Sequence, residues 1–360
     1  VAGFEDSPVP ERIVKILQTL GDSSTVEYIK RHYGEMEGER EPMKYTLLEV
    51  LSNIKTSASY GVLKDKLLTD LPHEGDPSSL EYTLQDSSEL TRTLFPEILQ
   101  LVRDSVFAQS LVSIALPLVD SGALHVSDLM PYRQAFLSLG KKNLQLMKKD
   151  SDKVWEYSDW IPFIGKFNDR ESNAMLREYL KLSELEIKHL ALITLIKNNQ
   201  PVPPSDIEKV AAGLFLRNQL YEELTEMKKT QLFPLKYRNQ KSLAEGQLFA
   251  IAADEVDDAD CNLVFIGERI AMYRGKKNKF YLFKVNLIFE DSSESYLGIA
   301  GPYEVVPKTL VNYGENTNMV WNEEYSTSKT EKQFRTFLKD HENYYREKDM
   351  PAESLNILKK

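Results

Sequence analysis

The stretch MKYTLLEVLSNIKTSASYGVLKDKLLTDL (residues 43–71) contains two apolar stripes on either side of a short polar link. The stripes consist of Tyr45, Leu47, Leu48, Val50, Leu51 and Ile54, and of Tyr60, Val62, Leu63, Leu67 and Leu68. Apolar residues that recur at this spacing are typical of one face of a helix. A turn of about four residues usually joins antiparallel neighbours. This stretch therefore predicts a pair of antiparallel helices.

Similar helical patterns return along the first two-thirds of the chain. They cover residues 90–102 and 105–122, and then residues 182–199 and 203–224. The pairs recur at roughly 40–50 residues, the period of HEAT repeats, and the first pair resembles a HEAT repeat most closely. One helix pair cannot bury its apolar face alone, so neighbouring pairs stack into a solenoid. We therefore expect a HEAT-like helical-repeat domain over residues 1–235, with an irregular helical array as the alternative.

Two of these helices begin with the pattern of a capping box. Ser205 and Glu208 follow Pro203 in one of them, and Ser183 and Glu186 stand at the start of the other. In a capping box the serine hydroxyl accepts a hydrogen bond from the backbone three residues on, and the glutamate bonds back to the serine N–H. The sequence predicts both boxes.

The character of the chain changes after Phe233–Pro234. From Leu248 the apolar spacing shifts from a helical period towards that of a strand, beginning with LFAIAA (248–253). Residues 262–273 and 279–289 are rich in β-branched and aromatic residues, and RGKKN between them reads as a hairpin turn. A further strand, YLGIAGPYEVV, follows a second turn. These patterns predict a small antiparallel β domain over residues 245–321.

The last segment, residues 326–360, contains KTEKQFRTFLKDHENYYREK (329–348), which reads as an amphipathic helix. The predicted fold class is therefore α+β. A HEAT-like α-solenoid or irregular helical array comes first, then the small antiparallel β domain, then a C-terminal helix and tail.

Composition limits the classes of function. The net charge is −10 and the pI is near 5.3, which disfavours a nucleic-acid or anionic-membrane binder. Cys261 is the single cysteine, so neither an internal disulfide nor a cysteine zinc cluster can form. No apolar run approaches the roughly 18 residues of a spanning helix, so we expect no membrane span. The start VAGFEDSPVPERI leads us to expect a segment of a longer polypeptide.

The acidic stretch DEVDDADCN (254–262) has the opening letters of an EF-hand loop, from Asp258 on. Such a loop needs glycine at its sixth position and a bidentate glutamate at its twelfth. Leu263 and Arg269 stand there instead. The five histidines form no local metal motif, and HExxH is absent. We therefore expect neither a metal nor another cofactor, and read the stretch as a solvated acidic connection.

No catalytic constellation emerges from the sequence. GxSxG is absent, and the carboxylates around Cys261 should raise its thiol pKa and weaken it as a nucleophile. We predict no catalytic residue and no enzyme. The alternative is a hydrolase whose site assembles only in three dimensions, with His189 and Glu186 as its best candidates.

Six residues are candidates for an interaction surface: Trp155, Trp160, His189, Tyr273, Lys276 and Lys277. The two tryptophans belong to an aromatic segment, 148–168, which reads as a plug between repeat blocks, or alternatively as an exposed platform. The histidine lies in an apolar helix and reads as core or groove lining. The other three form a basic hairpin tip with aromatic neighbours. Lysines at such tips usually prevent edge-to-edge pairing, so we expect no nucleic-acid binding.

The run KDKLLTDLP…LQDSSELTRTLFPEILQLVRDSVFAQSLVSIALPLVDSG (64–122) resembles the helical C-terminal region of large bacterial TraB/GumN-type proteins. YRGKKNKFYLFKV (273–285) extends the resemblance to about two-thirds of the chain. In that family the chemistry belongs to a GxxH motif near a strand in a separate domain. Gly122-Ala123-Leu124-His125 matches those letters but follows a helix, where Gly122 suits a C-cap. The resemblance thus implies an accessory region of an exported protein, without a catalytic role for His125.

These observations together predict a non-catalytic protein-interaction or scaffold module, part of a larger bacterial protein, with an unidentified protein partner. A carbohydrate-binding β domain that uses Tyr303, Tyr313 and Trp321 is a further alternative. The sequence does not determine the oligomeric state.

Overall fold

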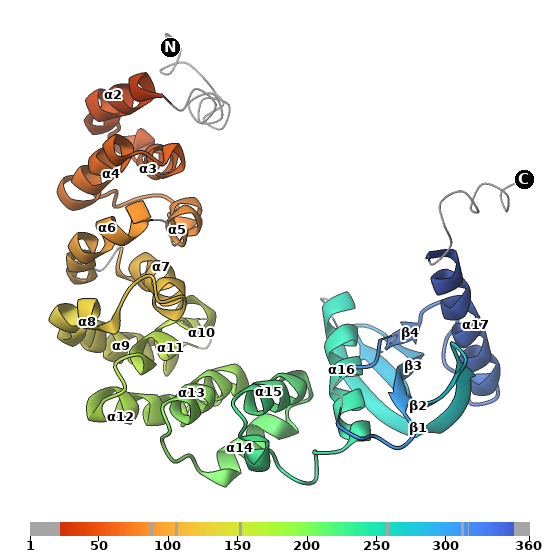
Figure 1. Ribbon diagram of the computed structural model, residues 1–360. Helices are drawn as coiled ribbons and strands as arrows, with labels where there is room; N and C mark the ends of the chain where they lie inside the picture. The colour runs from red at the N-terminus through yellow and green to blue at the C-terminus, as the bar shows by residue number, and fades with distance from the viewer. Residues whose placement is uncertain are drawn as a thin grey trace, which may run out of the picture. The chain divides into compact units, whose positions relative to one another are not determined.

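The computed structural model describes residues 22–86, 89–104, 107–150, 153–256, 259–310, 313–315 and 317–348, with side chains up to residue 342. The chain divides into two compact units, one up to Asn198 and one from Asn199 on. The predicted α+β class is confirmed, because a long series of helices precedes an antiparallel sheet and a C-terminal helix (Figure 1). The unit boundary lies before the predicted limit near residues 235–245, because the helices after Asn199 pack in series on the helix that covers the sheet.

The first unit is helical throughout its described part. Its α-helices are α2 (Ser23–His32), α3 (Met43–Ile54), α4 (Ser57–Thr69), α5 (Ser78–Leu84), α6 (Glu89–Ile98), α7 (Ala108–Asp120), α8 (Val126–Leu129), α9 (Arg133–Met147), α10 (Lys153–Glu156), α11 (Trp160–Gly165), α12 (Arg170–Tyr179) and α13 (Leu185–Lys197). Successive pairs pack in order, with α3 against α5, α4 against α6 and α5 against α7 (Figure 1). Each helix thus covers the apolar face of its counterpart in the preceding pair.

The predicted helix pair at 43–71 is confirmed as α3 and α4, which contact each other. The link is shorter than expected and consists of Lys55 and Thr56. Lys55 has a left-handed backbone with φ of 52°, which ends α3. Thr56 caps α4 by accepting a hydrogen bond from the Ser59 N–H. The apolar stripes face inward, as shown by the buried Leu48 and Leu63.

Two predicted helix starts are wrong in detail. The helix after Pro203 begins at Pro204, and its cap uses no side chain; Glu208 pairs with Lys236 instead. The helix near Ser183 begins at Leu185, again without a side-chain cap. Proline has no backbone N–H, so the helix that begins at Pro204 has one fewer N–H group to cap and does not need the serine.

The second unit starts with three helices: α14 (Pro204–Ala212), α15 (Leu214–Glu226) and α16 (Gln240–Glu255). The helix predicted over 203–224 is broken at Gly213, whose ψ of 115° leaves the helical region. The apolar run 248–253, which we predicted as the start of the β domain, is helical and belongs to α16. Its apolar residues contact the sheet. An apolar run this short is compatible with either a helix or a strand.

Four antiparallel strands follow in the described part of this unit, in the order β1-β2-β3-β4. They are β1 (Asp260–Tyr273), β2 (Lys276–Ile288), β3 (Ser293–Glu304) and β4 (Asn318–Val320), and α17 (Thr330–Lys348) closes the unit. The first hairpin turns at Arg274 and Gly275, whose φ values of 48° and 74° are both positive. A two-residue turn of this kind matches the twist of the strands it joins. The predicted hairpin and C-terminal helix are thus confirmed.

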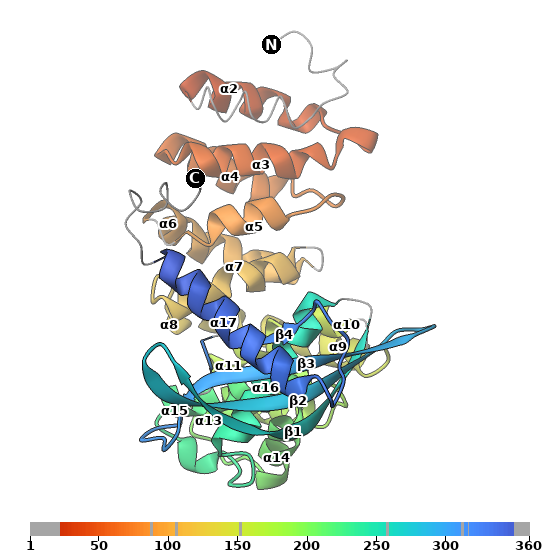
Figure 2. The same ribbon diagram turned by 90° about the vertical axis from the view of Figure 1, so that its right-hand side faces the viewer.

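Helices cover both faces of the sheet. Ala244, Leu248 and Ala252 of α16 pack on one face, with Phe283 and Val285 of β2. Helix α17 crosses the other face (Figure 2), where Phe334 and Phe337 pack on Phe280 and Leu282. Both faces of β2 are therefore buried over Phe280–Phe283.

Glycine allows the close approach of α16 to the sheet. Gly298 of β3 pairs with Phe283 and faces Leu248 of α16. A Cβ atom at Gly298 would lie 2.4 Å from Leu248 Cδ2 and 2.7 Å from Val285 Cγ2. These distances are shorter than any ordinary carbon contact.

Candidate functional site

Three of the six predicted surface residues are buried, which corrects the predicted surface. Trp160 is 1% exposed and His189 and Tyr273 are each 2% exposed. The Trp160 ring lies among aromatic residues, 6.3 Å from Phe136 and 6.5 Å from Phe163, and its Nε1–H bonds to Gln109. The aromatic plug interpretation is therefore confirmed for Trp160, and the exposed-platform alternative is wrong for it. The physical reason is the large apolar area that an indole buries.

Burial of His189 bears on the hydrolase alternative. His189 is a buried residue of α13, among the other buried residues of that helix, and Glu186 precedes it by about one helical turn. A general base must reach the substrate or a water molecule that attacks it. A ring as buried as this one has no open approach in the described structure.

The other three predicted residues lie on the surface. Trp155 of α10 is 68% exposed, and Lys276 and Lys277 follow the hairpin turn at the start of β2. The two tryptophans belong to the first unit and the two lysines to the second. Because three of the six candidates are buried, the six do not form one surface.

One cavity does gather several sequence candidates, beside the turn between β1 and β2. It measures about 520 Å³, and its lining includes Tyr273, Lys276, Tyr303 and Tyr313. Two of its tyrosine hydroxyls are already engaged. The Tyr303 hydroxyl donates to Gln247 Oε1 at 2.9 Å, and the Tyr313 hydroxyl donates to Glu222 Oε2 at 3.2 Å. Satisfied groups of this kind hold the fold together and offer a ligand little.

The carbohydrate alternative required Tyr303, Tyr313 and Trp321 to converge. Tyr303 and Tyr313 line the cavity just described, whereas Trp321 lines a different one. Tyr303 is also buried. The three rings therefore do not line one common cavity, and carbohydrate binding stays a prediction.

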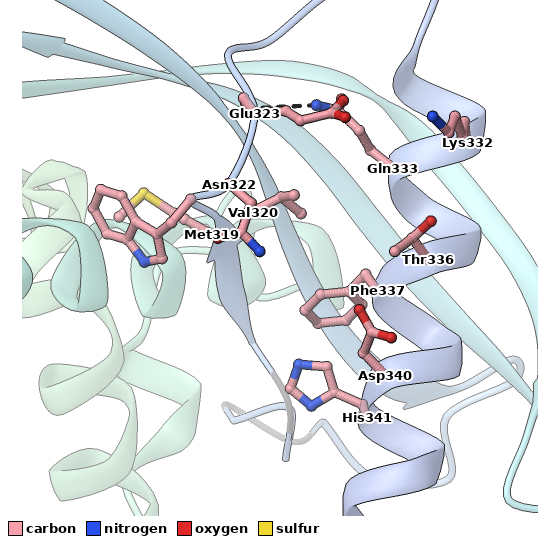
Figure 3. Close-up of a pocket in the computed structure, with 11 residues that line it drawn as sticks. Met319, Val320, Asn322, Glu323, Lys332, Gln333, Thr336, Phe337, Asp340 and His341 are labelled. Atoms are coloured by element: carbon pink, nitrogen blue, oxygen red, sulfur yellow. Dashed lines mark hydrogen bonds between the residues drawn. The ribbon is translucent and has the colours of Figure 1, made fainter.

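The cavity that Trp321 lines lies between the end of β4 and helix α17 (Figure 3). It measures about 270 Å³, the size of one amino-acid side chain rather than of a large cofactor. The lining residues are Met319, Val320, Trp321, Asn322, Glu323, Lys332, Gln333, Thr336, Phe337, Asp340 and His341. We call this the β4–α17 cavity. None of its residues except Trp321 was a candidate from the sequence.

The two aromatic pairs near the β4–α17 cavity lie on opposite faces of the sheet. Trp321 packs on Tyr296 at 5.1 Å between ring centroids, on the face that α16 covers, and His341 packs on Phe337 of α17 at 4.2 Å. Burial lowers the pKa of His341, outweighing the opposing effect of Asp340. The imidazole is therefore neutral at neutral pH and adds no positive charge to the cavity.

Two oxygen atoms at the β4–α17 cavity have no hydrogen-bond partner among the described residues. They are Gln333 Oε1 and Glu323 Oε2. Gln333 is 3% exposed, so its carbonyl oxygen is removed from bulk water. Lys329 Nζ lies 3.9 Å from Glu323 Oε2 and forms an ion pair with this carboxylate. A buried acceptor without a hydrogen-bond donor costs about 1–3 kcal/mol.

The outer edge of β1 is a second feature of this unit. Within the described residues no strand pairs with that edge. Ile270 and Met272 on it are 55% and 58% exposed, and Val264 and Phe265 are exposed as well. A bulge between Phe265 and Gly267 interrupts the regular pairing of β1 with β2. Bulges are one way in which proteins limit uncontrolled edge pairing.

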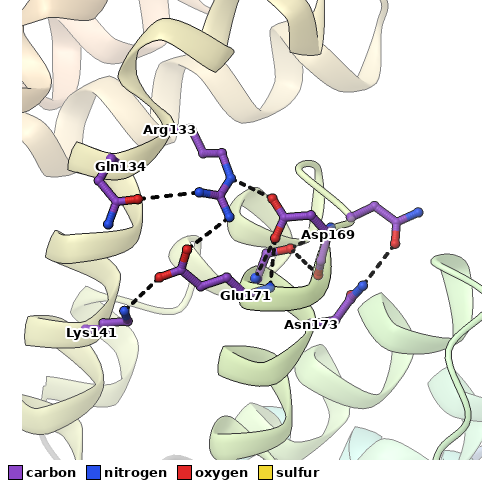
Figure 4. A network of polar contacts seen from close by, with 8 residues as sticks. Arg133, Gln134, Lys141, Asp169, Glu171 and Asn173 are labelled. Atoms are coloured by element: carbon purple, nitrogen blue, oxygen red, sulfur yellow. Dashed lines mark hydrogen bonds and ion pairs between the residues drawn. The ribbon is translucent and has the colours of Figure 1, made fainter.

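An ion-pair network in the first unit is structural (Figure 4). Arg133 of α9 donates to Asp169 Oδ2 at 2.5 Å and to Glu171 Oε2 at 3.1 Å. Asp169 also caps α12, accepting from the backbone of Ser172 at 2.9 Å. Hydrogen bonding by Arg133 lowers the pKa of Asp169 to about 2. The network ties two helices together and leaves no group poised for proton transfer at neutral pH.

The acidic stretch lies partly outside the described residues, because Asp257 and Asp258 are not described. Across the remainder, no three His, Cys, Asp or Glu side chains gather in a way that would hold a metal ion. Burial raises the pKa of Cys261 to about 11. The predicted direction of this shift is confirmed, although the cause is burial beside the sheet rather than the neighbouring carboxylates.

The GxxH letters have a structural explanation. Gly122 has a φ of 74° and follows the end of α7, and its N–H donates to the Val119 carbonyl at 3.1 Å. His125 precedes α8, and its backbone N–H donates to Asp128 Oδ2 at 3.0 Å. The motif therefore ends one helix and starts the next, as expected for a glycine C-cap.

Among the helices that the structure describes, none has the length and apolar content required to traverse a lipid bilayer. Comparisons with protein-family models, with curated proteins and with solved structures found no match for this chain. The resemblance to TraB/GumN-type proteins therefore stays a prediction.

Proposed function

We propose that this chain is a non-catalytic protein-interaction module, in which the open edge of β1 binds an extended segment of a partner protein. The stacked helix pairs of the first unit would act as a HEAT-like scaffold. The resemblance to TraB/GumN-type proteins adds the proposal that the module belongs to a larger exported bacterial protein. The carrying observation is the group of exposed apolar side chains along β1.

The edge of β1 offers both parts of a strand-addition site. No strand of the described residues pairs with its outer side, and its exposed side chains provide an apolar surface. Ile270 and Met272 are two residues apart after the bulge, so they point to the same side of the sheet. Strand addition uses main-chain hydrogen bonds for affinity and alternate side chains for specificity.

The neighbouring strand indicates the charge of the partner. Ile270 pairs with Lys279 and Met272 pairs with Lys277 across β1 and β2. The apolar pair therefore has lysines beside it towards the hairpin. A segment added to β1 would lie two strand spacings, about 10 Å, from these lysines, a distance over which opposite charges still attract at physiological salt. We expect a partner segment with alternating apolar residues and an acidic residue near the hairpin end.

The bulge sets the length of the site. From Gly267 to Tyr273 the pairing of β1 with β2 is regular. A stretch of this length is typical of a strand in a globular protein. The proposed partner segment is therefore short, and it lies between the bulge and the hairpin turn.

A peptide display selection on the whole chain tests the proposal with defined probes. Selected peptides should alternate apolar residues and carry an acidic residue at one end. The Ile270→Glu and Met272→Glu variants should bind them about tenfold more weakly or worse, because each places a carboxylate on the apolar edge. Tyr82→Glu is the control, since Tyr82 is an exposed ring, 80% open to solvent, and lies in the helical unit.

Hydrogen exchange separates edge binding from binding elsewhere. A peptide added to β1 should slow exchange of backbone amides between Gly267 and Tyr273. Equal affinity for the chain and both glutamate variants, or protection confined to other elements, would show that β1 is not the site.

A further inference from the structure

We propose that the segment bound at the edge of β1 is β1 of a second copy of this chain. The two four-stranded sheets would then join into one antiparallel sheet across a two-fold axis at Ile270. This inference rests on the proposed function, because it uses the same edge between Gly267 and Tyr273 and names what binds there.

The turn between β1 and β2 determines which main-chain groups of β1 point outward. Tyr273 and Lys276 flank the two-residue turn, so they form a hydrogen-bonded pair. Hydrogen-bonded and non-hydrogen-bonded pairs alternate along an antiparallel ladder. In the regular stretch, the N–H and C=O groups of Glu268, Ile270 and Met272 therefore point away from β2, towards the open edge.

The stretch available for pairing is symmetric about Ile270. It runs from Gly267, after the bulge, to Tyr273, before the turn, and Ile270 is its central residue. In a symmetric antiparallel pair one residue lies opposite its own copy, because opposite residues point to the same face of the sheet. With Ile270 at that position, the whole stretch of one copy pairs with the whole stretch of the other. Glu268 then lies opposite Met272 of the second copy.

The neighbouring registers are less favourable. Placing Glu268 or Arg269 on the axis sets two like charges directly opposite each other, which destabilises a strand pair. Placing Ala271 on the axis brings Glu268 opposite Arg274 of the second copy, which is a turn residue and no longer part of the strand. Only the register about Ile270 avoids both like-charge pairs and keeps the outward main-chain groups paired.

The side chains of β1 agree with this register. Ile270 and Met272 are 55% and 58% exposed, so the pairing would cover two apolar side chains of each copy. Glu268 of the second copy would lie towards the hairpin, where the proposed function expects an acidic residue. The strand therefore provides the main-chain groups, the apolar residues and the acidic residue that its own edge requires. A two-fold pair also closes, and leaves the edge unavailable for further strand addition.

Sedimentation equilibrium of the whole chain tests the dimer, over about 1 µM to about 500 µM, which brackets a micromolar Kd. The expected result is a monomer–dimer equilibrium that Ile270→Glu weakens about tenfold or more, because it sets two carboxylates opposite each other. Ile288→Glu is the matched control. Ile288 of β2 is 48% exposed and lies outside the paired stretch, so this variant should dimerise like the parent chain. A dimer that Ile270→Glu does not weaken would overturn the inference, because it would use another surface.

Disulfide trapping tests the register in a Cys261→Ser background, by mixing Arg269→Cys chains with Ala271→Cys chains. Arg269 and Ala271 of the second copy form a non-hydrogen-bonded pair in the register about Ile270. Their Cα atoms would lie about 4.5 Å apart, a separation that a disulfide spans. The mixture should form covalent dimers on mild oxidation, and each variant alone should form few. Efficient cross-linking of either variant alone would place the axis at that residue, and would contradict the axis at Ile270.

Peptide binding separates failure of this inference from failure of the proposed function. A chain that stays monomeric, yet binds selected peptides with protection of the amides between Gly267 and Tyr273, would rule out the second copy and retain the proposed function. A monomer that binds no peptide at β1 would overturn both. In the expected dimer, exchange of the Glu268, Ile270 and Met272 amides should slow as the chain concentration rises.

Discussion

Gln247 of α16 accepts a hydrogen bond from the Tyr303 hydroxyl of β3 at 2.9 Å, in the interior between helix and sheet. The same Gln247 oxygen accepts from the Gly314 N–H at 2.7 Å and from Thr317 Oγ1 at 3.0 Å. Its Nε2 donates to the Gly314 carbonyl at 3.0 Å. One side chain thus holds the segment before β4 against α16.

Replacing this glutamine should strongly destabilise the second unit. Gln247→Leu leaves several buried groups without partners, at a cost of about 2–5 kcal/mol in the free energy of unfolding. Tyr303→Phe removes one of the bonds and should cost about 1 kcal/mol. Urea-dependent hydrogen exchange in residues 240–320 measures both. Similar losses for the two variants would show that the network is not centred on Gln247.

Gly298 should tolerate no larger residue. Gly298→Ala places a methyl group 2.4 Å from Leu248 Cδ2, and we expect a loss of about 1–3 kcal/mol in unfolding free energy. Gly267→Ala is the control, because its nearest neighbour would be Arg269 Nη1 at 3.5 Å, an ordinary contact. Denaturant unfolding of both variants compares them. An unchanged stability of Gly298→Ala would mean that α16 shifts away from the sheet at little cost.

Asp169 should stabilise the first unit in a pH-dependent way. Arg133 lowers its pKa from 3.8 to about 2, so its ionised form is favoured by folding. This stabilisation is complete above pH 3.8 and is lost as the pH falls towards 2. The difference in unfolding free energy between the parent chain and Asp169→Asn should therefore be largest at pH 6 and shrink at pH 2.5.

The alanine variant at the same position separates the ion pair from the helix cap. Asparagine still accepts from the backbone of α12, whereas alanine does not. Asp169→Ala should thus cost about 1 kcal/mol more than Asp169→Asn at pH 6. Equal losses would indicate that the cap contributes nothing measurable.

Cys261 should react slowly with thiol reagents. With its pKa raised to about 11 by burial, the thiolate fraction at pH 8 is about 100-fold below that of a thiol with a pKa of 9.0. The rate of alkylation by iodoacetamide should rise with pH up to about 11. The chain unfolded in guanidinium chloride is the control and should react much faster at pH 8. A native rate that levels off near pH 9 would contradict the shift.

Several parts of the fold follow from local patterns. The helix pair at 43–71 and the hairpin around Gly275 depend on residues close in sequence, and both were predicted. The run at 248–253 was misread, because a short apolar run fits either element. Its helical state reflects Ala244, Leu248 and Ala252, which together face the sheet.

The candidate sites were less predictable. Trp321 was a sequence candidate, but its partners Glu323 and Gln333 carry no motif. The end of β4 lies next to α17 because of how α17 packs on the sheet, and no local sequence pattern predicts that contact. The predicted surface failed at Trp160 and Tyr273 for a similar reason, since large aromatic residues occur both in cores and at interfaces.

The sequence by itself determined the order and type of most elements, because helix and strand periodicity, turn glycines and polar links act over a few residues. Only the tertiary structure decided that both faces of β2 are buried. The same holds for two features of the described residues: no strand pairs with the outer edge of β1, and Gln333 Oε1 has no hydrogen-bond donor. Burial and unmet hydrogen bonds depend on which distant segments come together, and no local pattern specifies them.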